Sequence, residues 1–311
     1  MRVTSKMMLG NYLNNINNNL STLTKLQTQQ ATGKRINKVS DDPTGFISSM
    51  KVRVKLYKTE QYERNVGNAL SWLDQTESSF MELNEVIKSA YDTAVNQSTG
   101  TMSPEDKRAA AELIGQLRDH VIDIGNTKSG DKYIFGGYNV SNAPFKADGA
   151  GGIMYNGLDL TDATNAALLA ENDAKIEYAV GFNITMDIST TGTELFGMGD
   201  DNIYSILDGF YNALMSDAPS DELGSYITKL QDAQDRVLSL GAEIGGKTNR
   251  LELIQNRFEE DVLTYTERKS NIENVDQAEA IMNYKMAEAI YIASLQIGAS
   301  IIQPSLLDFL K

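Results

Sequence analysis

The chain has 311 residues, a formal net charge of -14 and no cysteine. The lack of thiols excludes disulfides and thiol chemistry, and the acidic balance argues against a nucleic-acid partner, which needs concentrated positive charge. No unbroken apolar stretch follows Arg2 and Lys6, and the apolar run 290–302 is too short to cross a membrane. We therefore expect neither a signal peptide nor a membrane span, and composition alone favours a cytoplasmic protein.

The first forty residues predict a helix that ends in a turn, and they carry six Lys or Arg and no acid. Apolar residues recur at spacings of four and three, on one helix face: Leu9, Leu13, Ile16, Leu20 and Leu23. Gly33 can end this helix, and Asp42 before Pro43 can start the next. Taken alone, this is an ordinary helix–turn–helix corner. A basic arm for nucleic acid is a rival interpretation, but it lacks stacking aromatics beyond Tyr12.

Two more helices are predicted before the centre of the chain. An a/d heptad pattern runs over residues 66–94, with Thr76 as its one polar interruption. Ser103 and Pro104 then provide a cap and a first helical residue, and the following apolar stripe ends at Ile124.

Residues 133–200 are rich in glycine and predict a small, mostly β insertion. Residues 175–180 and 183–188 are short alternating or β-branched runs, 133–135 is another possible strand, and 165–172 is a possible short helix. Such short strands suit an exposed, variable outer domain, for which adhesion is one possible role.

A helix resumes over 201–215, and an apolar series of period seven then runs to residue 272. Its members are Leu223, Leu230, Val237, Ile244, Leu251, Phe258, Tyr265 and Ile272. Fifty helical residues span about 75 Å, which predicts a rod rather than a compact globule. We expect its core at Leu230, Val237, Ile244, Leu251 and Phe258, against the helices at 46–94 and 104–124.

After residue 272 the period changes from seven to eleven, which indicates a second packing environment in residues 273–311. Val275, Met286 and Ile297 are eleven residues apart, as are Met282 and Ala293. Residues 271–311 carry five acids and two lysines, so their charge complements that of the basic first forty residues.

One stretch, residues 241–248, matches the phosphate-binding pattern GxxxxGK[ST] and ends in Lys247 and Thr248. The series of period seven passes through it at Ile244, which a strand and a phosphate loop would interrupt. We therefore predict that this stretch is helical and keep a P-loop nucleotide-binding protein only as an alternative. His120 is the only histidine, so no second imidazole completes a metal site.

Several stretches together resemble the flagellin superfamily. They are MRVTSKMML at the start, TGKRINKVSDDPTG in the first turn, DKYIFGGYNVSNAPF before the centre, GAEIGGKTNRLELIQNRFEED in the second half and QPSLLDFL at the end. Pro43, the motif at 143–145 and the ending favour the hook-associated branch, which joins the flagellar hook to the filament. Filament flagellin is the alternative within the superfamily.

The resemblance implies a mainly α fold with a small β insertion, in which long heptad-patterned helices form an elongated rod and the terminal helices pair. The expected segments are an assembly helix 1–40, a rod half 41–132, an outer domain 133–200, a rod half 201–272 and an assembly helix 273–311. It also implies a structural protein without catalysis or cofactor. Export without a cleaved signal would carry it to the extracellular flagellum, which replaces the cytoplasmic expectation.

The partners implied are copies of the chain in a ring, an adjacent hook-associated protein, filament flagellin and a cytoplasmic export chaperone, with no nucleic acid and no membrane. The expected assembly interface is Leu9, Leu13, Ile16, Leu20, Leu23, Arg35, Asp41, Asp42, Val275, Met282, Met286, Ala289, Ala293 and Ile297. We expect residues 1–40 and 273–311 to be mobile in the monomer and to become ordered when neighbouring subunits bury both stripes.

Overall fold

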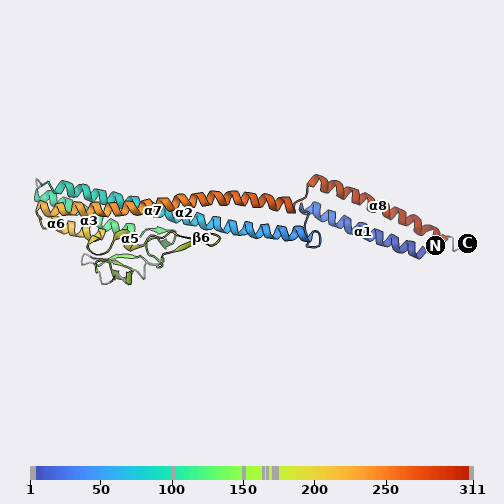
Figure 1. The fold of residues 1–311 in the computed structure, drawn as a ribbon, viewed down its shortest axis with the longest axis horizontal. Helices are drawn as coiled ribbons and strands as arrows, with labels where there is room; N and C mark the ends of the chain where they lie inside the picture. The colour runs from blue at the N-terminus through green and yellow to red at the C-terminus, as the bar shows by residue number, and fades with distance from the viewer. Residues whose placement is uncertain are drawn as a thin grey trace. The chain divides into compact units, whose positions relative to one another are not determined.

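The computed structural model describes residues 5–99, 102–148, 152–162, 165, 168–169 and 175–307 (Figure 1). It is mainly helical with small antiparallel sheets, which confirms the predicted class. The helices are α1 (Ser5–Thr32), α2 (Pro43–Gln97), α3 (Pro104–Gly125), α5 (Gly192–Phe196), the 3-10 helix η2 (Gly199–Asp201), α6 (Ile203–Met215), α7 (Ser220–Glu273) and α8 (Gln277–Leu307). The chain divides into two compact units, residues 1–59 with 260–311 and residues 60–259.

In the unit formed by the two chain ends, α1 lies beside α8 (Figure 1). The start of α2 lies beside the end of α7, where Arg53 binds Glu273 and the Lys55 ammonium lies over the Tyr265 ring. Gly33 ends α1 with a φ of +68°, a conformation that glycine adopts without strain. This unit therefore consists of two helix pairs and the turns that connect them.

In the unit of residues 60–259, α3 packs against α6, and parts of α2 and α7 complete the helical core. Ser103 caps α3: its hydroxyl accepts from the Asp106 N–H, and the Asp106 carboxylate accepts from the Ser103 N–H. The residues of the series of period seven up to Phe258 are buried here, which are Leu223, Leu230, Val237, Ile244, Leu251 and Phe258. Facing them, Tyr62 of α2 stacks on Phe258 with ring centroids 6.0 Å apart.

Among the described residues of the same unit, the strands form three small antiparallel sheets. They are β1 (Lys128–Ser129) with β2 (Lys132–Tyr133), β3 (Phe145–Ala147) with β4 (Ile153–Tyr155) and β5 (Leu158–Asp159), and β6 (Glu177–Gly181) with β7 (Ile184–Asp187). Of the expected strand at 133–135, only Tyr133 is in a strand, whereas Ile134 and Phe135 are buried beyond its end. The expected helix at 165–172 lies mostly outside the described residues.

An aromatic cluster joins these strands to the helices. Phe145 of β3 lies against Phe196 of α5, with ring centroids 4.5 Å apart, and against Tyr155 of β4, at 5.0 Å. Glycine makes this approach possible: a Cβ on Gly192 would lie 2.4 Å from Tyr155, and one on Gly125 would lie 2.6 Å from Phe145. Gly125 at the end of α3 and Gly192 at the start of α5 therefore serve packing, because any side chain there would collide with the aromatic rings.

Candidate assembly surface

One stripe of α1 packs against one stripe of α8. Up to residue 26 of α1 the half-buried residues follow spacings of four and three, and they are Tyr12, Ile16, Asn19, Leu23 and Leu26. The Tyr12 hydroxyl donates to the Ser294 carbonyl at 3.1 Å, and the Asn19 amide donates to the Ser294 hydroxyl at 2.8 Å. A Cβ on Gly298 would lie 1.7 Å from the Tyr12 hydroxyl oxygen, so the glycine leaves room for the tyrosine ring.

Each helix also carries apolar side chains outside this seam. On α1, Leu9, Leu13 and Leu20 are exposed, whereas Ile16 and Leu23 lie at the seam. On α8 the exposed members of the expected stripe are Met282, Met286, Ala289, Ala293 and Ile297, whereas Val275, before the helix, is half-buried. Met282 and Met286 are both 58% exposed, a large fraction for apolar side chains. The expected N-terminal stripe is therefore divided between two faces, and the side chains of the C-terminal stripe are almost all exposed.

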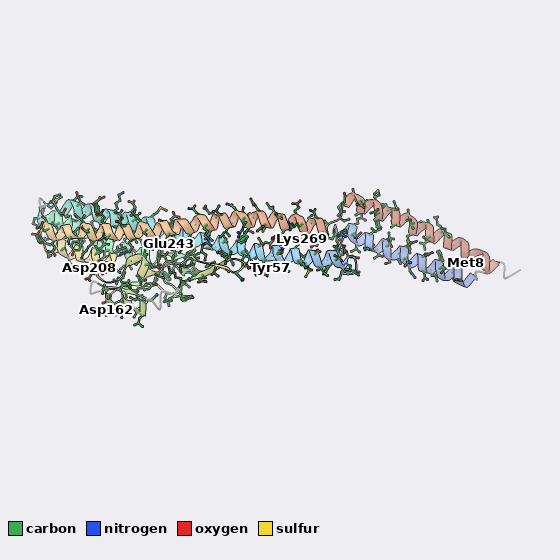
Figure 2. The ribbon with its side chains drawn as sticks, viewed as in Figure 1. Met8, Tyr57, Asp162, Asp208, Glu243 and Lys269 are labelled. Carbon is green, nitrogen blue, oxygen red and sulfur yellow. The ribbon has the colours of Figure 1, made fainter. Side chains whose placement is uncertain are left out.

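Further apolar side chains of α8 are exposed outside this stripe. They include Ile281, Ile290, Ile292 and Leu295. A helix that is apolar around its circumference is normally buried on every side. In the single chain α8 is covered mainly along its seam with α1, and exposed patches of this kind mark sites of association. Met8 also exposes an apolar side chain near the start of α1 (Figure 2).

The turn between α1 and α2 pairs with the turn between α7 and α8. The Arg35 N–H donates to the Glu273 carbonyl at 2.6 Å, and the Val275 N–H donates to the Gly33 carbonyl at 3.1 Å. The Arg35 guanidinium bridges the Asp42 carboxylate and the Ile272 carbonyl, both at 3.1 Å. Two connections more than 230 residues apart are thus joined by backbone and side-chain bonds.

Asp41 and Asp42 shape this turn. The Asp41 carboxylate accepts from the Lys38 N–H at 2.9 Å, and Asp42 accepts from the Gly45 N–H at 2.9 Å at the start of α2. These bonds favour the ionised form, so the backbone N–H of Lys38 lowers the pKa of Asp41 and that of Gly45 lowers the pKa of Asp42. The structure thus gives Asp42 a capping role at the start of α2, places Asp41 as an acceptor within the preceding turn, and pairs Arg35 with Asp42.

Glu273, the last residue of α7, is a buried acid that the sequence analysis missed. Its carboxylate accepts from Arg53 Nη2 at 2.6 Å and from the Ser49 hydroxyl, and Lys34 Nζ lies 3.7 Å away. The bonds from Arg53 lower the pKa of Glu273 to about 2, and those from Ser49 and the charge of Lys34 add to the effect. Its partners come from α2 and from the first turn, so Glu273 fixes three segments of the unit at one point.

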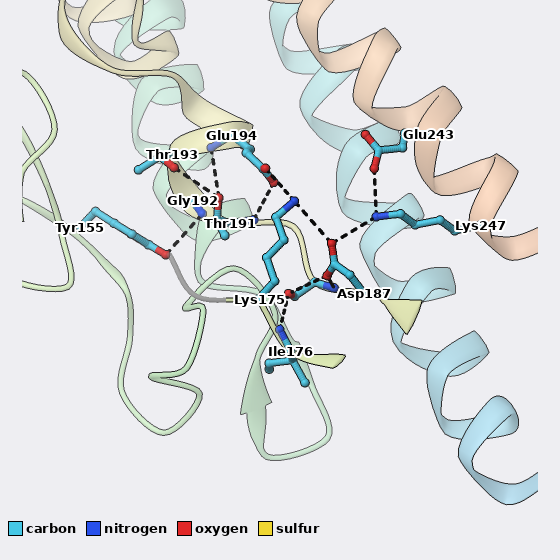
Figure 3. Close-up of polar contacts among 11 residues, drawn as sticks. Tyr155, Lys175, Ile176, Asp187, Thr191, Gly192, Thr193, Glu194, Glu243 and Lys247 are labelled. Atoms are coloured by element: carbon cyan, nitrogen blue, oxygen red, sulfur yellow. Dashed lines mark hydrogen bonds and ion pairs between the residues drawn. The ribbon is translucent and has the colours of Figure 1, made fainter. Parts of the chain in front are cut away.

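The phosphate-binding pattern lies within α7, which confirms the predicted helix. The Lys247 ammonium binds Glu243 at 3.0 Å and Asp187 of β7 at 3.6 Å, as Figure 3 shows. Lys175 bridges Asp187 at 3.4 Å and Glu194 of α5 at 2.8 Å. Burial disfavours the charge on Lys175, but these carboxylates outweigh it and raise its pKa. Within a helix the N–H groups bond to backbone carbonyls, so they cannot surround a phosphate as a P-loop does. Lys247 instead links α7 to β7 through its ion pair with Asp187.

We expect Lys247→Ala to leave assembly nearly normal. We expect no difference in nucleotide binding between the variant and the natural chain. The half-exposed ion pairs of Lys247 contribute at most about 1 kcal/mol. Titration with magnesium and ATP at millimolar concentration checks the second expectation on both proteins. ATP binding by the natural chain that disappears in the variant would restore the nucleotide-binding alternative.

Comparisons with known proteins agree with this geometry. Residues 3–140 match the family model of the bacterial flagellin N-terminal helical region. The chain is 27% identical to flagellar hook-associated protein 3 of Escherichia coli, covering 94% of this chain and 95% of that protein. It is 23% identical to flagellin of Bacillus subtilis, covering 91% and 90%.

Solved structures show the same fold. A putative flagellar hook-associated protein from Vibrio parahaemolyticus superposes with a TM-score of 0.66 at 20% identity, covering 75% of this chain and 100% of that chain. The flagellar junction protein of Legionella pneumophila superposes with a TM-score of 0.58 at 14% identity, covering 74% and 100%.

The family model, the near full-length relatives and the fold all match flagellin-like structural proteins of the bacterial flagellum rather than enzymes. Among its relatives is hook-associated protein 3, which it matches over nearly its whole length. No helix in the described part of the chain has the length and apolarity needed to cross a membrane. Within the same residues, no three acidic or histidine side chains gather as a metal ion would require.

Proposed function

We propose that this protein forms the junction between the flagellar hook and the filament, and that its copies join in a ring through α1 and α8. The observation that carries this proposal is the set of apolar side chains outside the seam on each terminal helix, which stays exposed in the single chain. Flagellar hook-associated protein 3 of Escherichia coli, which is similar over nearly the full length, is named for its association with the hook. The adjacent hook-associated protein and filament flagellin are then its neighbours.

The single seam between α1 and α8 provides little free energy to keep the two helices ordered in the monomer. It contains the polar residues Asn19 and Ser294, and much of the apolar surface lies outside it. Fixing each backbone residue costs about 1–2 kcal/mol, which one half-buried stripe hardly offsets. We infer that both helices exchange between open and paired forms until neighbouring subunits cover the apolar side chains outside the seam. Such a chain is suited to export in an open form, with a chaperone covering α8 in the cytoplasm and the ring forming outside the cell.

We expect Met286→Glu to reduce incorporation at the junction at least about tenfold. Burying a methionine side chain contributes about 1.5–3 kcal/mol, and a buried carboxylate without a partner adds a further penalty. The matched control is Gln231→Glu, which places the same charge at an exposed polar position of α7 in the unit of residues 60–259. Immunogold labelling counts incorporated protein, and protein in the culture medium measures export separately.

The position of the label separates the two flagellar alternatives. A junction protein gives one band per flagellum, whereas a filament flagellin gives continuous decoration. Continuous labelling would assign the protein to the filament. Normal incorporation of Met286→Glu would show that the α8 stripe is not an assembly surface.

A further inference from the structure

A stripe of apolar side chains near the start of α2 faces away from α7. Ile47, Met50, Val54 and Tyr57 follow spacings of three and four on one helix face and are exposed, Tyr57 by 66%. Lys51 and Lys55 line the shallow groove between them. The residues that face α7 lie on the other side of the helix, and Ser49, Leu56 and Thr59 are buried there.

The end of α7 carries a corresponding outer stripe of the opposite charge. Leu263 is 72% exposed, and Glu260 and Glu267 lie three residues before it and four after it, on the same face. The residues turned toward α2 are again on the other side, where Val262, Tyr265 and Ile272 are half-buried. The two outer stripes therefore lie on opposite sides of the α2–α7 pair.

Charge distinguishes the two stripes. Residues 46–58 contain four Lys or Arg and no acid, whereas residues 258–267 contain four acids and no base. Among the residues that the structure describes, Lys51, Glu260 and Glu267 have no ion-pair partner. Lys55 lies over Tyr265 and Arg53 binds Glu273, so the two stripes occupy the same stretch of the helix pair.

We propose that the basic outer stripe of α2 docks on the acidic outer stripe of α7 in a second copy of this chain. Both stripes have an apolar centre, and opposite charges set which surface meets which. Because they lie on opposite sides of the pair, the contact runs head to tail, and a closed series of such contacts is a ring. This surface rests on the proposed function and adds a side-to-side contact to that of the terminal helices.

Two charge-reversed variants test the contact between copies. One carries Lys51→Glu with Lys55→Glu, and the other carries Glu260→Lys with Glu267→Lys. Each alone places like charges opposite one another at every contact, and we expect at least about tenfold less protein at the junction. Expressed together, the two variants can alternate around the ring with opposite charges at their contacts, so incorporation returns toward the natural level.

The mixture separates contact between copies from damage within one copy, because neither variant repairs its own chain. Asp232→Lys with Asp235→Lys is the matched control, an equal charge change at exposed positions elsewhere on α7. Circular dichroism on the exported monomers checks that each variant folds. Normal incorporation of either variant alone, or a mixture no better than the variants alone, would overturn this contact. Absence of the natural protein from the junction would instead overturn the proposed function.

Discussion

Replacing Leu251 by alanine is expected to lower the free energy of unfolding of the residue 60–259 unit by about 2–5 kcal/mol. Leu251 is fully buried in α7. Phe258, about two helical turns later, is also buried and stacks on Tyr62. Truncation leaves a cavity in a packed interior, and the surroundings close it only in part. Phe258→Ala should have an effect of similar size.

Leu253→Ala is the matched control, because the same substitution two residues away removes a side chain that is 71% exposed. Urea unfolding of the three proteins gives the comparison, and the control should stay within about 0.5 kcal/mol of the natural chain. Equal midpoints for Leu251→Ala and Leu253→Ala would show that the series of period seven does not form the core.

Replacing Glu273 by glutamine is expected to weaken the paired turns by about 2–3 kcal/mol near neutral pH. The carboxylate is buried and has Arg53, Ser49 and Lys34 as partners, whereas an amide keeps the shape and loses the charge. The fall in the pKa of Glu273 to about 2 sets the size of this loss, and the partial exposure of Arg53 reduces it. The neighbouring exposed Glu279→Gln is the control.

The effect has a defined pH dependence. The pKa of Glu273 is about 2 in the folded chain and near 4.5 otherwise, so its contribution is present above pH 4.5 and disappears as the pH falls toward 2. Hydrogen exchange at the amides of Arg35 and Val275 reports the local opening, since both N–H groups bond across the two turns. The difference between Glu273→Gln and the natural chain should shrink over that range. A difference that persists unchanged at pH 2 would exclude the carboxylate as its cause.

Periodicity predicted the long helices well because each repeat marks one continuous face. The series through Ile244 and Leu251 is buried, and it showed correctly that the phosphate-binding pattern is helical. The caps at Ser103 and Gly33 also determined helix ends locally.

The division of the terminal stripes could not be predicted in the same way. α1 carries apolar residues on two adjacent faces, so spacing alone placed Ile16 with Leu13, although one lies at the seam and the other is exposed. Which face meets α8 depends on side chains such as Tyr12, whose partner Gly298 is nearly three hundred residues away. Glu273 was missed for the same reason, since its hydrogen-bond partners Ser49 and Arg53 lie more than two hundred residues earlier in the chain.

The small sheets were the hardest part to predict from sequence. Strands such as β1 and β5 have two residues each, too few for an alternating pattern. Two of the turns place an asparagine at positive φ, Asn156 and Asn183, in addition to the glycines that mark turns in a sequence. Their arrangement depends on the aromatic cluster around Phe145, which forms only when distant segments meet.

Hydrogen exchange followed by mass spectrometry, on the free protein and on the same protein in isolated flagella, tests the assembly account most directly. The account predicts fast exchange along α1 and α8 in the free chain and strong protection of both helices after assembly, with little change in the residue 60–259 core. Slow exchange throughout both helices in the free chain, or equal exchange before and after assembly, would contradict it.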